Sequence, residues 1–69
     1  MNWVRENACL IMNTTIRCPV NRAIRMHLKD VKIGDSNGRL VFECPKCGRK
    51  KIVRFLEKDK KVEWVTIGL

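Results

Sequence analysis

The chain has 69 residues with four cysteines, and its 15 Lys and Arg against 7 Asp and Glu give a formal net charge of +8. The N-terminal residues lack the long apolar core of a secretory signal, and no segment approaches the ~20 apolar residues of a membrane span. These absences favour a single cytoplasmic domain with no membrane partner, whose closely spaced cysteines are reduced and bind metal rather than form disulfides.

Residues 1–13 allow two interpretations. Their apolar side chains recur near helical spacing and would form the stripe of one short helix; they are Trp3, Val4, Ala8, Ile11 and Met12. Alternatively, Met12 is a natural start, and the residues before it are an extension with little role in the domain. On either interpretation we expect an N-terminal extension over 1–13 and the domain over 14–69.

Two strands are predicted in the first half of that domain. Residues 14–18 are a short β-rich run that ends at Pro19, which has no amide donor to continue strand pairing. Residues 22–33 alternate between apolar and polar side chains, and the phase shifts by one near Lys29 and Asp30. A strand with a break or bulge at that point explains the pattern better than a helix does.

A hairpin is predicted next, because Asn37 and Gly38 tolerate positive φ in the turn over 34–38. Three further runs have the composition or alternation of strands, namely residues 39–44, 51–57 and 62–67. The fold class we expect is therefore a small, mostly-β domain with an antiparallel sheet of three to four strands.

The segment Cys44-Pro45-Lys46-Cys47-Gly48 is the strongest local signal of chemistry. Two thiolates separated by two residues in a tight turn can both bind one ion at about 2.3 Å, and Gly48 lets the chain turn back. A redox motif uses the same spacing at the start of a helix, but no helix pattern follows Cys47. Since so small a domain needs stabilisation beyond its core, a structural metal is the prediction.

A structural site of this kind takes four protein ligands, and the partner cysteines are expected upstream. Cys18 begins a second Cys-Pro turn, but Asn21 occupies the position where its second cysteine would stand. Three alternatives could complete the site: His27, which is the only imidazole; Cys9; or water or Asn21 itself, giving a weaker site or none. The sequence leaves these alternatives open.

Residues 14–55 resemble the zinc-ribbon superfamily, especially the small ribbon proteins encoded by phages, viruses and prokaryotes. The residues that carry the resemblance are Cys18-Pro19, Leu28 through Ile33, and Phe42 through Arg49. The resemblance implies a Zn²⁺ ion held between two hairpin turns, with Cys18, Cys44 and Cys47 at ligand positions. Asn21 departs from the pattern, so His27, or Cys9 in its place, is the predicted fourth ligand. Many members of the family bind nucleic acid or dock onto transcription or translation machinery.

Basic side chains accompany both predicted turns. Around the first turn they are Arg17, Arg22, Arg25 and Lys29, and after the second they are Lys46, Arg49, Lys50, Lys51 and Arg54. If the two turns share a metal, both sets converge on one end of the domain and suit contacts with phosphates. Phe55 or Trp64 could stack on a base if exposed, but such large apolar side chains more often belong to the core.

The leading hypothesis is a zinc ribbon that binds DNA or RNA, and a candidate regulator of transcription. The phosphate-binding residues expected are Arg22, Arg25, Arg49, Lys50, Lys51 and Arg54. The alternative is a protein-interaction module that docks on a larger machine such as RNA polymerase through its sheet edge or apolar N-terminus. An enzyme is not expected, because the chain offers no acid, base and nucleophile set beyond its cysteines.

Overall fold

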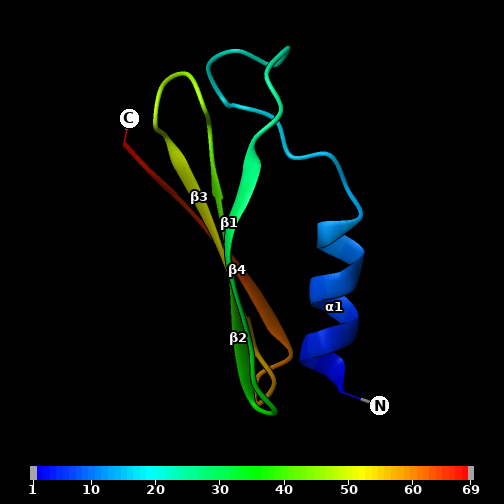
Figure 1. Ribbon diagram of the computed structural model, residues 1–69. Coiled ribbons are helices and arrows are strands. Elements are labelled where there is room, and N and C mark those ends of the chain that lie inside the picture. Colours follow the sequence, from blue (N-terminus) through cyan, green and yellow to red (C-terminus); the bar gives the residue numbers. More distant parts are fainter. Residues whose placement is uncertain (1, 69) are drawn as a thin grey trace.

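The computed structural model describes residues 2–68 and contains one helix followed by four strands (Figure 1). The elements are α1 (Trp3–Met12), β1 (His27–Ile33), β2 (Asn37–Glu43), β3 (Lys50–Leu56) and β4 (Lys61–Ile67). The strands form one antiparallel sheet in the order β1-β2-β3-β4, so each strand pairs with its neighbour in the chain. The expected small, mostly-β fold is confirmed.

Helix α1 lies against one face of the sheet and leaves the opposite face, here called the open face, uncovered (Figure 1). Val4 and Ala8 of the helix are fully buried with Leu40, Val53 and Phe55 of the two central strands. The side chain of the residue before α1, an Asn, accepts a hydrogen bond from a backbone N–H in the first turn and caps the helix. The helix interpretation of the N-terminal residues is confirmed, and the helix shares its core with the sheet.

The helix is held close to the sheet at Gly38, which has a different role from the one predicted. The predicted hairpin is confirmed, since β1 and β2 pair on either side of this turn, but Asn37 and Gly38 belong to β2 and have no positive φ, so the predicted conformation is wrong. A Cβ atom at Gly38 would lie 2.6 Å from Val4 Cγ1 and 3.0 Å from the carbonyl oxygen of Lys32. Glycine is therefore required here by the approach of the helix rather than by the turn.

The predicted bulge is confirmed in β1. Leu28 pairs with Phe42 and Asp30 pairs with Val41, so Lys29 is the extra residue between two consecutive partners in β2. This insertion explains the one-residue shift in the apolar pattern, because the side chains on both sides of the bulge can then face the core.

The predicted strand over 14–18 is corrected to a single isolated bridge between Arg17 and Arg25. On either side of it, the N–H of Cys18 donates to the Ile24 carbonyl and the N–H of Met26 donates to the Ile16 carbonyl. The strand expected over 22–33 accordingly begins only at residue 27. The intervening residues form a narrow loop, because a proline and an Asn turn interrupt the ladder after the first pairs.

No helix within residues 2–68 is long and apolar enough to cross a membrane.

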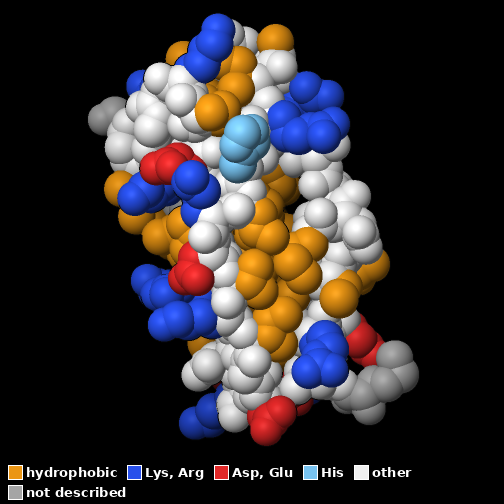
Figure 2. Space-filling view, in the orientation of Figure 1, with side chains coloured by type: hydrophobic (Ala, Val, Ile, Leu, Met, Phe, Trp, Pro, Cys, Tyr) orange, Lys and Arg blue, Asp and Glu red, His pale blue; other side chains and the backbone are white. Residues whose placement is uncertain are grey.

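The space-filling view in Figure 2 shows hydrophobic side chains exposed between the helix and the neighbouring edge of the sheet. Two side chains of the edge strand β1, Leu28 and Val31, are about two-fifths exposed. The single helix therefore covers only part of the sheet face on which it lies.

Candidate metal centre

Three cysteine thiols meet between the loop before β1 and the loop that joins β2 to β3. Both loops lie at the upper end of the molecule in Figure 1. The Sγ atoms of Cys18, Cys44 and Cys47 all lie within 4.8 Å of one another, and those of Cys18 and Cys47 are 3.5 Å apart. Cys18 and Cys44 are buried, whereas Cys47 is exposed. The cluster therefore has two sulfurs inside the protein and one side open to solvent.

The loop between β2 and β3 presents two of these thiols through a closed backbone turn. The N–H of Gly48 donates to the carbonyl of Cys44 at 3.0 Å, and the N–H of Cys44 donates to the carbonyl of Arg49 at 2.8 Å. Gly48 has a φ of +73°, in the left-handed region that favours glycine. This conformation brings the chain back into β3 with both cysteine side chains on the same side of the turn.

The third thiol comes from the loop that precedes β1. Asn21 occupies the corner of this loop, and its side-chain oxygen accepts a hydrogen bond from the N–H of Ala23 at 3.1 Å. Its backbone carbonyl accepts a second bond, from the N–H of Ile24. Asn21 thus shapes the turn that presents Cys18, and its side-chain oxygen is already engaged within the loop.

The surroundings of Cys47 and Cys44 shift the pKa values of these two thiols in opposite directions. The backbone N–H and the guanidinium of Arg49 lower the pKa of Cys47 from 9.0 to about 6, so this thiol is largely ionised at neutral pH. The backbone N–H of Cys47 acts to lower the pKa of Cys44, but burial and the adjacent thiols outweigh it and raise that pKa. Cys47 therefore becomes a thiolate, the form that binds metals, at lower pH than Cys44 does.

The spacing of the thiols fits a metal ion. Four sulfurs held tetrahedrally at about 2.3 Å from Zn²⁺ are separated from one another by about 3.8 Å. The separation of 3.5 Å between Cys18 and Cys47, and the upper limit of 4.8 Å within the cluster, bracket that value. Small shifts of the side chains would bring all three sulfurs to one ion, so the cluster can hold a metal.

Neither predicted fourth ligand is brought to the cluster. His27 lies opposite Glu43 in the sheet, and the strand alternation places both on the open face, whereas Cys44 next to Glu43 is buried. Cys9 is exposed on α1, one position beyond the buried Ala8. Within residues 2–68, no other His, Cys, Asp or Glu side chain joins the three thiols.

Positive charge is concentrated around this cluster. The two segments that contain its cysteines, residues 14–26 and 44–51, carry seven of the 15 Lys and Arg residues and none of the seven acids. The rest of the chain holds eight Lys and Arg against seven acids, so nearly all of the net charge of +8 belongs to the two segments. Figure 2 shows Lys and Arg side chains at this upper end of the molecule. We call it the thiol end.

Most of these cations have no carboxylate partner. The seven are Arg17, Arg22, Arg25, Lys46, Arg49, Lys50 and Lys51. Of these seven, only Lys50 forms an ion pair within residues 2–68, with Glu43 at 4.0 Å. Arg17, Arg22 and Lys51 line a cavity of about 380 Å³ beside Cys18. The thiol end therefore presents an uncompensated positive surface.

The basic run that follows Cys47 is divided between the two faces of the sheet. Lys51 is on the face covered by the helix, in register with Phe42, whereas Arg54 is on the open face, in register with Arg39. Because side chains alternate along a strand, a continuous basic run in β3 cannot form one patch. Arg54 was predicted to join the thiol end, and the structure instead places it further along the open face.

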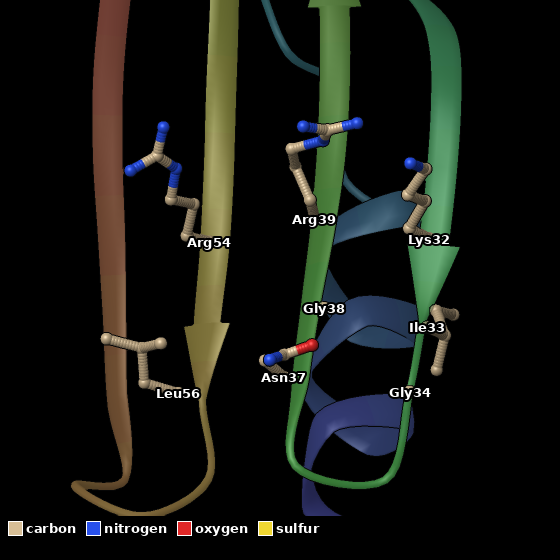
Figure 3. A pocket seen from close by; sticks show the side chains of 8 residues that line it. All are labelled: Lys32, Ile33, Gly34, Asn37, Gly38, Arg39, Arg54 and Leu56. Atoms are coloured by element: carbon tan, nitrogen blue, oxygen red, sulfur yellow. The ribbon is translucent and has the colours of Figure 1, made fainter.

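A second group of cations, which the sequence did not indicate, lies around a shallow hollow of about 590 Å³ on the open face. Lys32, Arg39 and Arg54 stand side by side on three neighbouring strands, on the side of the sheet away from the helix (Figure 3). Arg39 pairs with Asp30 at 3.2 Å and Arg54 lies opposite Glu63, so acids partly neutralise this row. The strand register, once known, would have revealed this row of cations, because it places Lys32, Arg39 and Arg54 opposite one another.

Comparisons with protein-family models, curated proteins and solved structures found no match. The described residues form a small four-stranded antiparallel sheet with one helix and a cluster of three cysteines that can bind a metal ion.

Proposed function

We propose that this protein is a small zinc-ribbon-like protein that binds nucleic acid at its thiol end. The observation that carries the proposal is the segregation of charge: the segments that contain the three thiols hold seven cations and no acid. Such a surface attracts polyanions and raises their rate of encounter with the protein. Nucleic acid is the polyanion whose regularly spaced phosphates several separate cations can contact at once.

The metal in this proposal is structural. Thiolate ligands favour Zn²⁺ among the common metal ions of tetrahedral sites, and the ion would join the loop before β1 to the loop between β2 and β3. Water, or a donor from a bound partner, would take the fourth position on the exposed side of Cys47. We do not propose catalysis, because within residues 2–68 no carboxylate or imidazole lies in the cluster to act as a general base.

Charge reversal tests the proposal. Arg22, Lys46 and Lys51 take part in no ion pair among the described residues, so changing them to Glu removes positive charge without breaking one. The matched control changes Arg5, Lys32 and Lys58 to Glu, which gives the same net charge away from the thiol end. Affinity for a fluorescent DNA or RNA strand is measured at several salt concentrations, and metal content is measured for both variants.

The proposal predicts that the thiol-end variant loses binding and that the control retains most of it. The logarithm of the wild-type binding constant should fall linearly with the logarithm of salt concentration, and each phosphate contact should contribute about −0.7 to −0.9 to the slope. Equal losses in the two variants would mean that net charge alone drives the binding, and would contradict a specific surface at the thiol end.

A second candidate function, docking on another protein, is favoured by the edge strand β4. Trp64, Val65 and Ile67 are between 37% and 50% exposed, so apolar side chains emerge on both faces of an edge strand whose outer side pairs with no other strand in residues 2–68. An extended segment of a partner could pair with this edge. Replacing Val65 and Ile67 with Lys would then abolish capture of the partner while leaving nucleic-acid binding intact.

A further inference from the structure

Trp64 lies on the face of the sheet that carries the core, yet it does not belong to the core. It pairs in register with Val53, which is fully buried, and side chains directly opposite in an antiparallel pair share one face. Trp64 is nevertheless 50% exposed, and it is not among the partly buried side chains that pack against the core, a group that includes Val62 on the same strand. An aromatic surface is thus presented to solvent at the sheet edge.

One cation lies next to this aromatic surface, and two more share a cavity with that cation. Lys51 pairs in register with Thr66, which makes it the diagonal neighbour of Trp64, and such neighbours are about 7–8 Å apart and within reach of long side chains. Lys51 also lines the cavity of about 380 Å³ that Arg17 and Arg22 border in the loop of Cys18. None of these three cations forms an ion pair within the described part of the chain.

We propose that Trp64 and the cavity bordered by Lys51, Arg17 and Arg22 form a binding surface for single-stranded nucleic acid. Trp64 stacks on one base, and the three cations contact the phosphates that follow it towards the thiol end. The inference rests on the proposed function and specifies the form of the nucleic acid. In a duplex both faces of each base are covered by its neighbours, whereas a single strand can place an unstacked base on an aromatic side chain.

The charges favour this partner over an apolar segment of protein. The cation next to Trp64 on its own face is Lys51, which shares a cavity with Arg17 and Arg22 of the Cys18 loop, and no acid occurs in residues 14–26 or 44–51. An apolar segment lying on Trp64 would have to cover these cations without neutralising them, and removing unpaired charges from water costs free energy. A nucleic-acid strand brings an aromatic base and a phosphate within a single nucleotide, and so satisfies both neighbouring features.

The test uses the full chain and a single strand of about 12 nucleotides, of oligo-dT, with a duplex of the same length as the second probe. Since Trp3 and Trp64 are the only tryptophans, a Trp3→Phe background makes Trp64 the only source of tryptophan fluorescence. Trp64→Leu removes the aromatic face and keeps an apolar side chain, while Trp64→Phe retains a smaller ring. Affinity, fluorescence quenching, metal content and oligomeric state are measured for each protein.

The proposal predicts that single strand quenches Trp64 fluorescence and that Trp64→Leu weakens single-strand binding by about five- to hundredfold. Trp64→Phe should recover much of the loss, and binding of the duplex should be the same in all three proteins. Unchanged single-strand affinity in Trp64→Leu would overturn the inference while leaving nucleic-acid binding in place. If Trp64→Leu changed only the oligomeric state of the protein and not its single-strand binding, the inference would be overturned as well. If the wild type bound neither probe, the proposed function itself would fail.

Discussion

The Sγ atom of Cys18 lies 3.5 Å from the Sγ atom of Cys47, which follows it by 29 positions in the chain. Between them runs the whole β1–β2 hairpin, so this contact closes a long loop at one end of the sheet. The opposite end is held differently, by the packing of α1 on the central strands and by Lys60, whose Nζ lies 5.5 Å from the centre of the Trp3 ring. The two ends should therefore respond differently to loss of metal.

Removal of the metal is expected to loosen the thiol end first. The helix and the middle of the sheet keep their own core around Leu40, Val53 and Phe55, which does not depend on the ion. Hydrogen exchange measured with and without chelator should show faster exchange in residues 16–26 and 44–49 and little change in α1. Binding that is specific to the folded state stabilises it by about 4 kcal/mol when free metal is at 1,000 times its dissociation constant, so the melting temperature should also fall.

Equal protection in the presence and absence of chelator would contradict a metal at this site. Complete loss of protection in α1 would show instead that the ion is needed for the entire fold. Cys9→Ser serves as the matched control, because it removes an exposed thiol that lies outside the cluster.

In the metal-free protein, the reactivity of Cys47 and Cys44 should follow the difference between their pKa values. In the Cys9→Ser variant, alkylation of Cys47 is expected to have its midpoint near pH 6, because the N–H and guanidinium of Arg49 lower its pKa to about 6. Cys44 should react far more slowly at neutral pH, since it is buried and its pKa is raised. Mass spectrometry of alkylated peptides over a range of pH values checks both expectations, and a Cys47 midpoint near 9 would contradict them.

The same shift gives a pH dependence of stability with a defined sign. The pKa of Cys47 is about 6 in the folded protein and ordinarily 9.0, so its thiolate stabilises the metal-free fold fully above pH 9. That stabilisation is lost as the pH falls from 9 to 6. Denaturant unfolding of metal-free Cys9→Ser should show it, and adding Cys47→Ser should remove this part of the dependence. An unchanged pH profile in the double variant would assign the effect to another group.

Gly38→Ala tests the docking of the helix on the sheet. The added methyl group would lie 2.6 Å from Val4 Cγ1, and we expect a loss of about 1–3 kcal/mol, typical of overpacking in a core. If that contact is the cause, Val4→Ala should cost less in the Gly38→Ala background than in the wild type. Chemical denaturation of the four proteins gives this coupling energy. Additive effects would show that the strain arises elsewhere, such as at the carbonyl of Lys32.

The sheet could be predicted largely from local patterns. Alternation of apolar and polar side chains depends only on adjacent residues, and it located β2, β3 and β4 to within a few residues, as well as the bulge at Lys29. The turn containing Cys44 and Cys47 was likewise evident from its spacing. These features require no knowledge of which elements meet in space.

The features that could not be predicted depend on contacts between distant segments. The role of Gly38 is set by Val4, which lies 34 positions earlier in the sequence, and no local pattern links the two. The exposure of Trp64 depends on how far a single helix extends across the sheet. The division of Lys51 from Arg54, in contrast, follows from alternation along β3 alone, and the predicted strand was sufficient to show it.

The most direct test of the metal centre is native mass spectrometry of freshly purified protein, with and without chelator, for wild type, Cys9→Ser, Cys18→Ser and Cys47→Ser. We predict one zinc ion per chain in the wild type and in Cys9→Ser, and its loss or marked weakening in the other two variants. Protein that carries no metal when freshly prepared, or Cys18→Ser protein that keeps its zinc, would contradict a centre built from Cys18, Cys44 and Cys47.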